Sequence, residues 1–177
     1  MPSRALRGLL VSVIVLTAGA AWAQQPPAKP DLDAIPDKMP FNVPYGPAIG
    51  ADKAHEVIVA AVNEAKKRGW AMNVAVLDSG GQLVAFERMD GAQLASISIA
   101  QHKARAAVMY RRETKVFEGA IQNGGLNYIM TLDDVIASRG GIPLVEGGKL
   151  IGAIGCSGGT GSQDEVTAKA GAAVINK

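Results

Sequence analysis

The fold class of this chain is decided by residues 72–88, which read MNVAVLDSGGQLVAFER. The first seven of these residues are mostly apolar, which is typical of a buried strand. Ser79, Gly80 and Gly81 then form a turn, and residues 82–88 return as a strand whose side chains alternate in character. Strands joined by so short a turn are antiparallel. The segment therefore predicts a β-hairpin within an antiparallel sheet.

A second hairpin is predicted near the C-terminus, where strands over residues 142–146 and 149–156 flank two glycines. Residues 126–139 fit no single pattern, and a short strand is one interpretation of them. Apolar residues at helical spacing predict four helices, over residues 51–68, 96–110, 114–121 and 163–176. Hairpins connected by helices indicate an α+β domain in which helices cover an antiparallel sheet.

The first 23 residues have the three parts of a secretory signal peptide. Two arginines supply positive charge, residues 9–18 are apolar, and Ala21-Trp22-Ala23 is a small-x-small cleavage pattern. A membrane anchor is the alternative, but spanning a bilayer takes roughly 20 apolar residues and this run is shorter. We therefore predict a mature chain that begins at Gln24, is periplasmic or secreted, and has no membrane segment.

Residues 24–47 are predicted to be an extended linker, because seven prolines punctuate them. Phe41, Val43 and Tyr45 can pin the end of this linker onto the domain. Residues 48–177 are enough for one domain with a hydrophobic core.

Charge and cysteine content narrow the function classes. The chain has 18 Lys and Arg against 16 Asp and Glu, and two arginines leave with the signal peptide, so the mature chain has no net charge. This balance gives no electrostatic basis for binding nucleic acid or anionic membranes. Cys156 is the only cysteine, so an intramolecular disulfide is excluded, and we predict that its thiol is buried.

A Gly-rich loop follows the last predicted strand. Its G-x-S-x-G pattern resembles a nucleophile elbow, but no histidine follows in the sequence, so the hydrolase triad is excluded. The loop could cradle an anion, with Ser157, Gly158 and Asp164 as ligand candidates. Alternatively, it is a tight connection to the last helix, capped by Ser162 with Glu165 at the capping-box position. Both interpretations stay open.

The two histidines offer no cluster for a structural metal, but one imidazole is enough to hold a haem iron. His55 lies in the first turn of its helix beside the apolar face, from where it can reach a groove. His102 lies opposite the apolar stripe of its helix, so it faces solvent or a neighbouring subunit. Either residue could instead be an ordinary surface histidine.

Four charged residues are candidates for a rim that binds a carboxylate-bearing ligand: Arg88, Asp90, Lys103 and Asp164. The alternative is that they form structural ion pairs and caps.

Taken together, these motifs resemble the haem-binding family of GlcG and HbpS. The residues that carry the resemblance are 75–81, 86–92, the helix around Lys103, Gly140 to Leu144, 151–155, Ser157-Gly158, 163–165 and Ala170-Gly171. The resemblance implies a profilin-like fold with a five-stranded antiparallel sheet between helices. It also implies self-assembly, often into octamers, and binding or slow degradation of haem by some members. Related domains are attached to corrinoid enzymes.

The resemblance also bears on single residues. It implies His55 as the axial haem ligand, because a histidine of the first helix has this role in some relatives. Cys156 stands where the family usually has valine, and the segment 127–138 replaces a shorter loop.

The function expected first is therefore an exported haem-binding or haem-sequestering protein without efficient catalysis, assembled as a homo-oligomer. His55, Arg88, Lys103 and His102 are its cofactor-binding candidates, and Asp90, Ser157, Gly158 and Asp164 are its ligand-loop candidates. The alternatives are an enzyme or binding protein for a small carboxylate and a ligand-free accessory subunit.

Overall fold

The computed structural model describes residues 31–39 and 41–177, so the predicted signal peptide at residues 1–23 lies outside the described residues. The predicted helices and hairpins are confirmed to within a few residues at their ends. In chain order the elements are α1 (Ala51–Arg68), β1 (Asn73–Asp78), β2 (Leu83–Arg88), α2 (Ser96–Met109), α3 (Lys115–Gln122), the 3-10 helix η1 (Asn127–Thr131), β3 (Gly141–Glu146), β4 (Lys149–Ser157) and α4 (Gly161–Ala172).

The sheet has four antiparallel strands in the order β2-β1-β4-β3. The expectation of five strands is therefore wrong for the described residues. The segment left open in the sequence forms η1 and loops instead of a strand. The physical reason is its packing: Leu126 and Ile129 stand three residues apart, so both reach the same apolar cluster around Phe117. The profilin-like classification stays a prediction.

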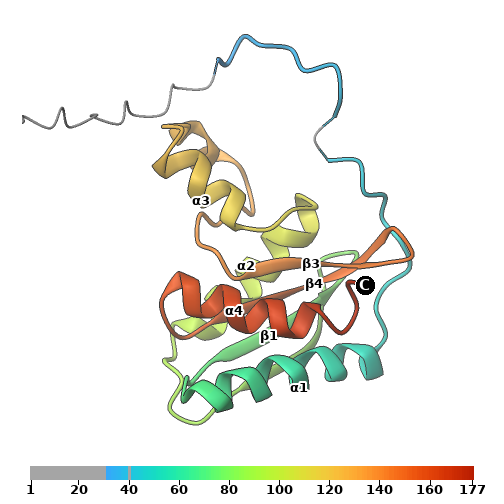
Figure 1. The fold of residues 1–177 in the computed structure, drawn as a ribbon, viewed down its shortest axis with the longest axis vertical. Helices are drawn as coiled ribbons and strands as arrows, with labels where there is room; N and C mark the ends of the chain where they lie inside the picture. The colour runs from blue at the N-terminus through green and yellow to red at the C-terminus, as the bar shows by residue number, and fades with distance from the viewer. Residues whose placement is uncertain (1–30, 40) are drawn as a thin grey trace, which may run out of the picture.

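Helices cover both faces of the sheet, as predicted (Figure 1). Alternate residues of β1 point to opposite faces. Val74 and Val76 join the core under α1 and α4, whereas Ala75 and Leu77 pack against α2. α3 and η1 form an outer unit that packs on α2 through Phe117. The result is a three-layer α/β/α arrangement with a helical extension beyond it.

The N-terminus of α4 is capped by Thr160, so the prediction of Ser162 as the cap is wrong. The Thr160 hydroxyl accepts a hydrogen bond from the backbone N–H of Gln163, and the Gln163 side chain accepts one from the backbone N–H of Thr160 at 2.8 Å. The reason is the backbone, because Thr160 is extended, as a cap residue must be, whereas Ser162 already lies within the helix.

The end of the linker is pinned to the domain by the three residues expected to do so. The Tyr45 hydroxyl donates to the Met109 carbonyl at 2.9 Å, Val43 packs beside α2, and the Phe41 ring lies under the Arg112 guanidinium. Tyr45 also forms a single parallel bridge to β4. Within the described ranges, no helix is long and apolar enough to cross a membrane.

Candidate functional site

Two of the predicted charged residues meet in the interior. The Lys103 ammonium lies 2.6 Å from the Asp164 carboxylate, and these side chains are 1% and 4% exposed. Lys103 is buried because it belongs to the sheet-facing stripe of α2, between Ala100 and Ala107. The two charges therefore neutralise each other in the interior. The Lys103 ammonium is thus not available to a ligand carboxylate.

Asp164 also holds the Gly-rich loop. Its second carboxylate oxygen accepts a hydrogen bond from the Gly159 backbone N–H at 3.1 Å. Burial raises the pKa of the Asp164 carboxyl, whereas the Lys103 ammonium and the backbone N–H groups of Gly158 and Gly159 lower it. A bound anion would have to displace a buried carboxylate from this N–H. The structure thus favours the tight-connection interpretation over the anion cradle.

The other two loop candidates are also engaged in packing. The Ser157 hydroxyl is buried and donates to the Ser96 hydroxyl at 3.0 Å. Gly158 lies so close to the preceding chain that an added Cβ would stand 2.3 Å from the Ala71 carbonyl oxygen. Ser157 therefore bonds the end of β4 to the start of α2, and Gly158 packs against the segment just before β1.

Arg88 and Asp90 are exposed and lie apart from the Lys103–Asp164 pair. They line a shallow groove of about 270 Å³ together with Lys66 at the end of α1. The four charged residues do not converge, so the predicted carboxylate rim is not formed within one subunit. This separation weakens the small-carboxylate alternative at that position.

Both histidines are exposed, and neither imidazole forms a hydrogen bond with another described residue. His55 stands on the outward face of α1, one turn from Ala51 and one turn from Val59, which is 41% exposed. His102 lines a groove of about 480 Å³ between α2 and the β1–β2 hairpin, beside Leu83 and Arg105. No group of three potential metal ligands occurs in the part of the chain that the structure describes.

The sequence analysis did not identify a cleft between α3 and η1, which we call the α3–η1 cleft. Its volume is about 400 Å³, and its lining includes Arg112, Phe117, Ala120, Leu126, Tyr128 and Ile129. A signal was present in the composition. Of the eight aromatic residues in the chain, five gather around this end of α2, namely Phe41, Tyr45, Tyr110, Phe117 and Tyr128.

Cys156 is fully buried in the core under α1 and α4, which confirms the predicted burial. Desolvation raises the pKa of its thiol well above the ordinary value, so the reactive thiolate is suppressed. We expect no reaction of the native protein with Ellman's reagent over hours, and one thiol per chain after unfolding in guanidinium chloride. Rapid labelling of the native protein would contradict this burial.

Comparison with known proteins assigns the chain to a family. The sequence profile described as "Haem degrading protein HbpS-like" matches residues 49–173. Protein GlcG of Escherichia coli (strain K12) is 44% identical over 104 residues, which cover 59% of this chain and 77% of GlcG.

Two solved structures share the fold. The crystal structure of HbpS has a TM-score of 0.69 and 29% identity, covering 75% of this chain and 93% of HbpS. The crystal structure of a PduOC:heme complex has a TM-score of 0.66 and 30% identity, covering 73% of this chain and 96% of that chain. With the profile match across most of its length, the chain belongs to the HbpS-like family.

Proposed function

We propose that this protein binds haem. The observation that carries the proposal is the likeness to the PduOC:heme complex, which extends over 96% of that chain at 30% identity. We also propose that the protein acts after export, as the predicted signal peptide implies, and as a homo-oligomer. In this proposal haem is bound without efficient turnover.

The residues around His55 fit one side of a haem. Haem binding in proteins needs an axial ligand, an apolar surface and a few polar groups that orient the ligand. The His55 imidazole is exposed and free of hydrogen bonds to the described residues, so a ring nitrogen can meet the iron. Ala51 and Val59 lie one turn to either side and are exposed apolar neighbours, although the charged Asp52 and Glu56 are exposed beside them. A second copy of the chain would cover the opposite side.

Of the two cationic cofactor-binding candidates, Arg88 and Lys103, only Arg88 is placed where it could bind the carboxylates of a haem. Lys103 is committed to Asp164 in the interior and is withdrawn from this role. Arg88 remains exposed at the end of β2. If haem binds, the His55 imidazole would hold its iron, Arg88 would pair with a carboxylate of the haem, and the haem would supply an iron centre.

A haem titration with two matched variants tests the proposal. We expect a saturable Soret band for the wild type. His55→Ala should weaken haem binding at least tenfold, or about 1.4 kcal/mol, and shift the Soret maximum, because the iron loses its axial ligand. His102→Ala is the control, since it removes the other exposed imidazole. It should leave the haem affinity and the Soret maximum unchanged.

Two results would contradict parts of this proposal. Loss of binding in His102→Ala, with an unchanged His55→Ala variant, would move the site to the groove beside Leu83 and Arg105. Absence of any saturable Soret band in the wild type would refute haem binding itself.

A further inference from the structure

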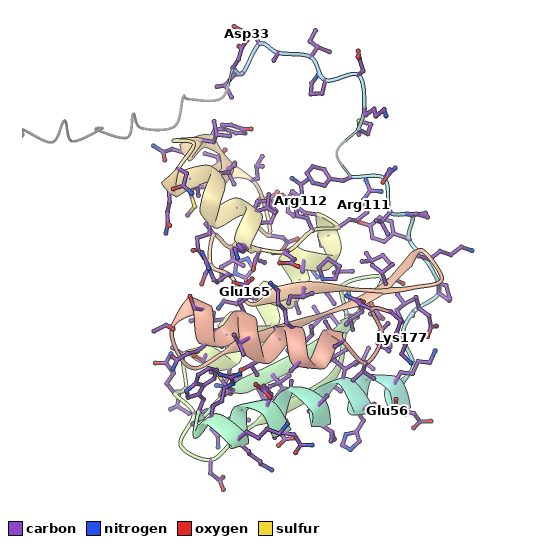
Figure 2. The ribbon with its side chains drawn as sticks, in the orientation of Figure 1. Asp33, Glu56, Arg111, Arg112, Glu165 and Lys177 are labelled. Atoms are coloured by element: carbon purple, nitrogen blue, oxygen red, sulfur yellow. The ribbon has the colours of Figure 1, made fainter. Side chains whose placement is uncertain are left out.

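Arg112 is a half-buried cation that has no counter-charge among the described residues. Its Nε donates to the Tyr110 carbonyl oxygen at 3.1 Å, and its Cζ lies 3.0 Å from the centre of the Phe41 ring. The two terminal nitrogens of the guanidinium have no hydrogen-bond acceptor among residues 31–39 and 41–177, and no carboxylate there lies within 4.0 Å of the group. Figure 2 shows Arg112 between the outer helical unit and the linker.

Two other partly buried arginines have carboxylate partners, and Arg111 donates to the Val43 carbonyl oxygen at 3.1 Å. Arg105 pairs with Asp134 at 2.8 Å, and Arg139 pairs with Glu118 at 2.6 Å. By contrast, burial and then the adjacent Arg111 charge lower the pKa of Arg112, and only tyrosine hydroxyls act in the opposite direction. Arg112 is only half-buried, so its terminal nitrogens can still be reached by a ligand, and an anion bound there would make charge-assisted hydrogen bonds in partly desolvated surroundings.

The space beside this cation is apolar and of ligand size. The α3–η1 cleft has a volume of about 400 Å³, within the range of about 300–1,000 Å³ typical of small-molecule sites. Phe117 is 3% exposed and lies edge-on to Tyr110, with the two ring centres 5.2 Å apart. Ala120, Leu126 and Ile129 complete the apolar wall. Aromatic walls favour a flat ring, which packs against them by stacking or edge contact.

We propose that the α3–η1 cleft binds a small aromatic carboxylate, with its ring against Phe117 and Ala120 and its carboxylate on the Arg112 guanidinium. The fork of the guanidinium suits a carboxylate because two parallel N–H groups can donate to its two oxygens. This site is separate from the haem proposal, since it uses neither histidine. It is built partly from segment 127–138, which contributes Tyr128, Ile129 and Leu132 to the lining.

Calorimetric titration of the full chain without haem tests the site, with 2-naphthoate as the probe and 2-naphthamide as its neutral counterpart. We expect the acid to bind at least tenfold more tightly than the amide. Arg112→Gln should remove this advantage and leave amide binding unchanged, whereas Arg112→Lys should retain part of it. Arg68→Gln is the control with the same charge change, because Arg68 pairs with Glu64 on exposed α1, and it should behave as wild type.

A second variant tests the apolar wall. Ala120→Trp fills the cleft, so binding of both probes should fall at least tenfold while the circular dichroism spectrum stays unchanged. His55→Ala should leave naphthoate binding intact, which separates this site from the haem proposal. Equal binding of acid and amide by the wild type, or no binding of either, would overturn the inference. A further result would also overturn it: the wild type does not bind naphthoate, and the oligomer mass changes in Ala120→Trp. In that case a second copy of the chain would occupy the cleft.

Discussion

Lys103→Met is expected to destabilise the folded domain by about 3–5 kcal/mol, because it leaves the Asp164 carboxylate buried without its counter-charge. Most domains have only about 5–15 kcal/mol of stability, so this loss is a large part of the total. Urea unfolding followed by circular dichroism measures it. The matched control is Lys53→Met, which breaks a 2.6 Å ion pair with Glu146 whose side chains are both 49% exposed. That exposed pair should contribute at most about 1 kcal/mol.

The loss in Lys103→Met should also depend on pH. Burial already raises the pKa of Asp164 above its ordinary value, and removing the Lys103 ammonium raises this pKa further. The folded state then keeps a proton that the unfolded state releases, so stability falls as pH rises from about 4 towards the folded-state pKa. We therefore expect a greater loss at pH 8 than at pH 5.

A double variant separates the missing counter-charge from the missing packing. Lys103→Met with Asp164→Asn removes both charges and keeps an oxygen that can accept from the Gly159 N–H. It should recover most of the lost stability and remove the added pH dependence. If the double variant is no more stable than Lys103→Met at pH 8, the ion pair is not the cause of the loss.

Gly155→Ala is expected to cost about 3 kcal/mol or more, although it adds a single methyl group. An added Cβ at Gly155 would stand 2.0 Å from the Ala100 carbonyl oxygen and 2.5 Å from the Ala104 nitrogen, both in the backbone of α2. Backbone atoms of a helix cannot move independently as a flexible side chain can, so the whole of α2 would have to shift away from the sheet. Thermal and urea unfolding of the variant measure this cost.

The control for Gly155→Ala is Gly119→Ala in α3. At that position the nearest atom to an added Cβ is the Asn123 amide nitrogen at 3.9 Å. Alanine favours a helix over glycine by about 0.5–1 kcal/mol, so this variant should be as stable as the wild type or slightly more stable. A Gly155→Ala protein as stable as the Gly119→Ala protein would show that α2 does not approach β4 this closely.

The local elements of this fold were predictable from the sequence because their signals are short-range. The turn at residues 79–81 and the glycines at 147 and 148 joined neighbouring strands, and apolar spacing marked α1 and α2. The number of strands was not predictable in this way. Whether Leu126 and Ile129 join a sheet or a helical cluster depends on Phe117, which lies outside their own segment.

The helix cap shows the same limit at a smaller scale. Two hydroxyl residues, Thr160 and Ser162, stand two positions apart at the start of α4, and each has a suitable partner three residues later. The path of the loop decides between them, because only the extended residue can cap.

The sequence by itself determined the α+β class, the burial of Cys156 and the motifs by which the chain resembles its family, because turns, apolar spacing and residue types can be recognised without knowing which distant residues meet. Only the tertiary structure decided what the charged residues do. Lys103 became a buried structural cation because α4 places Asp164 beside it, 61 residues away. Arg112 lies among aromatic rings of α3 and the linker, and no carboxylate from residues 31–39 or 41–177 pairs with it. The sequence specifies which residues are charged. Whether a charge is desolvated or paired depends on distances between residues, and only folding sets those distances.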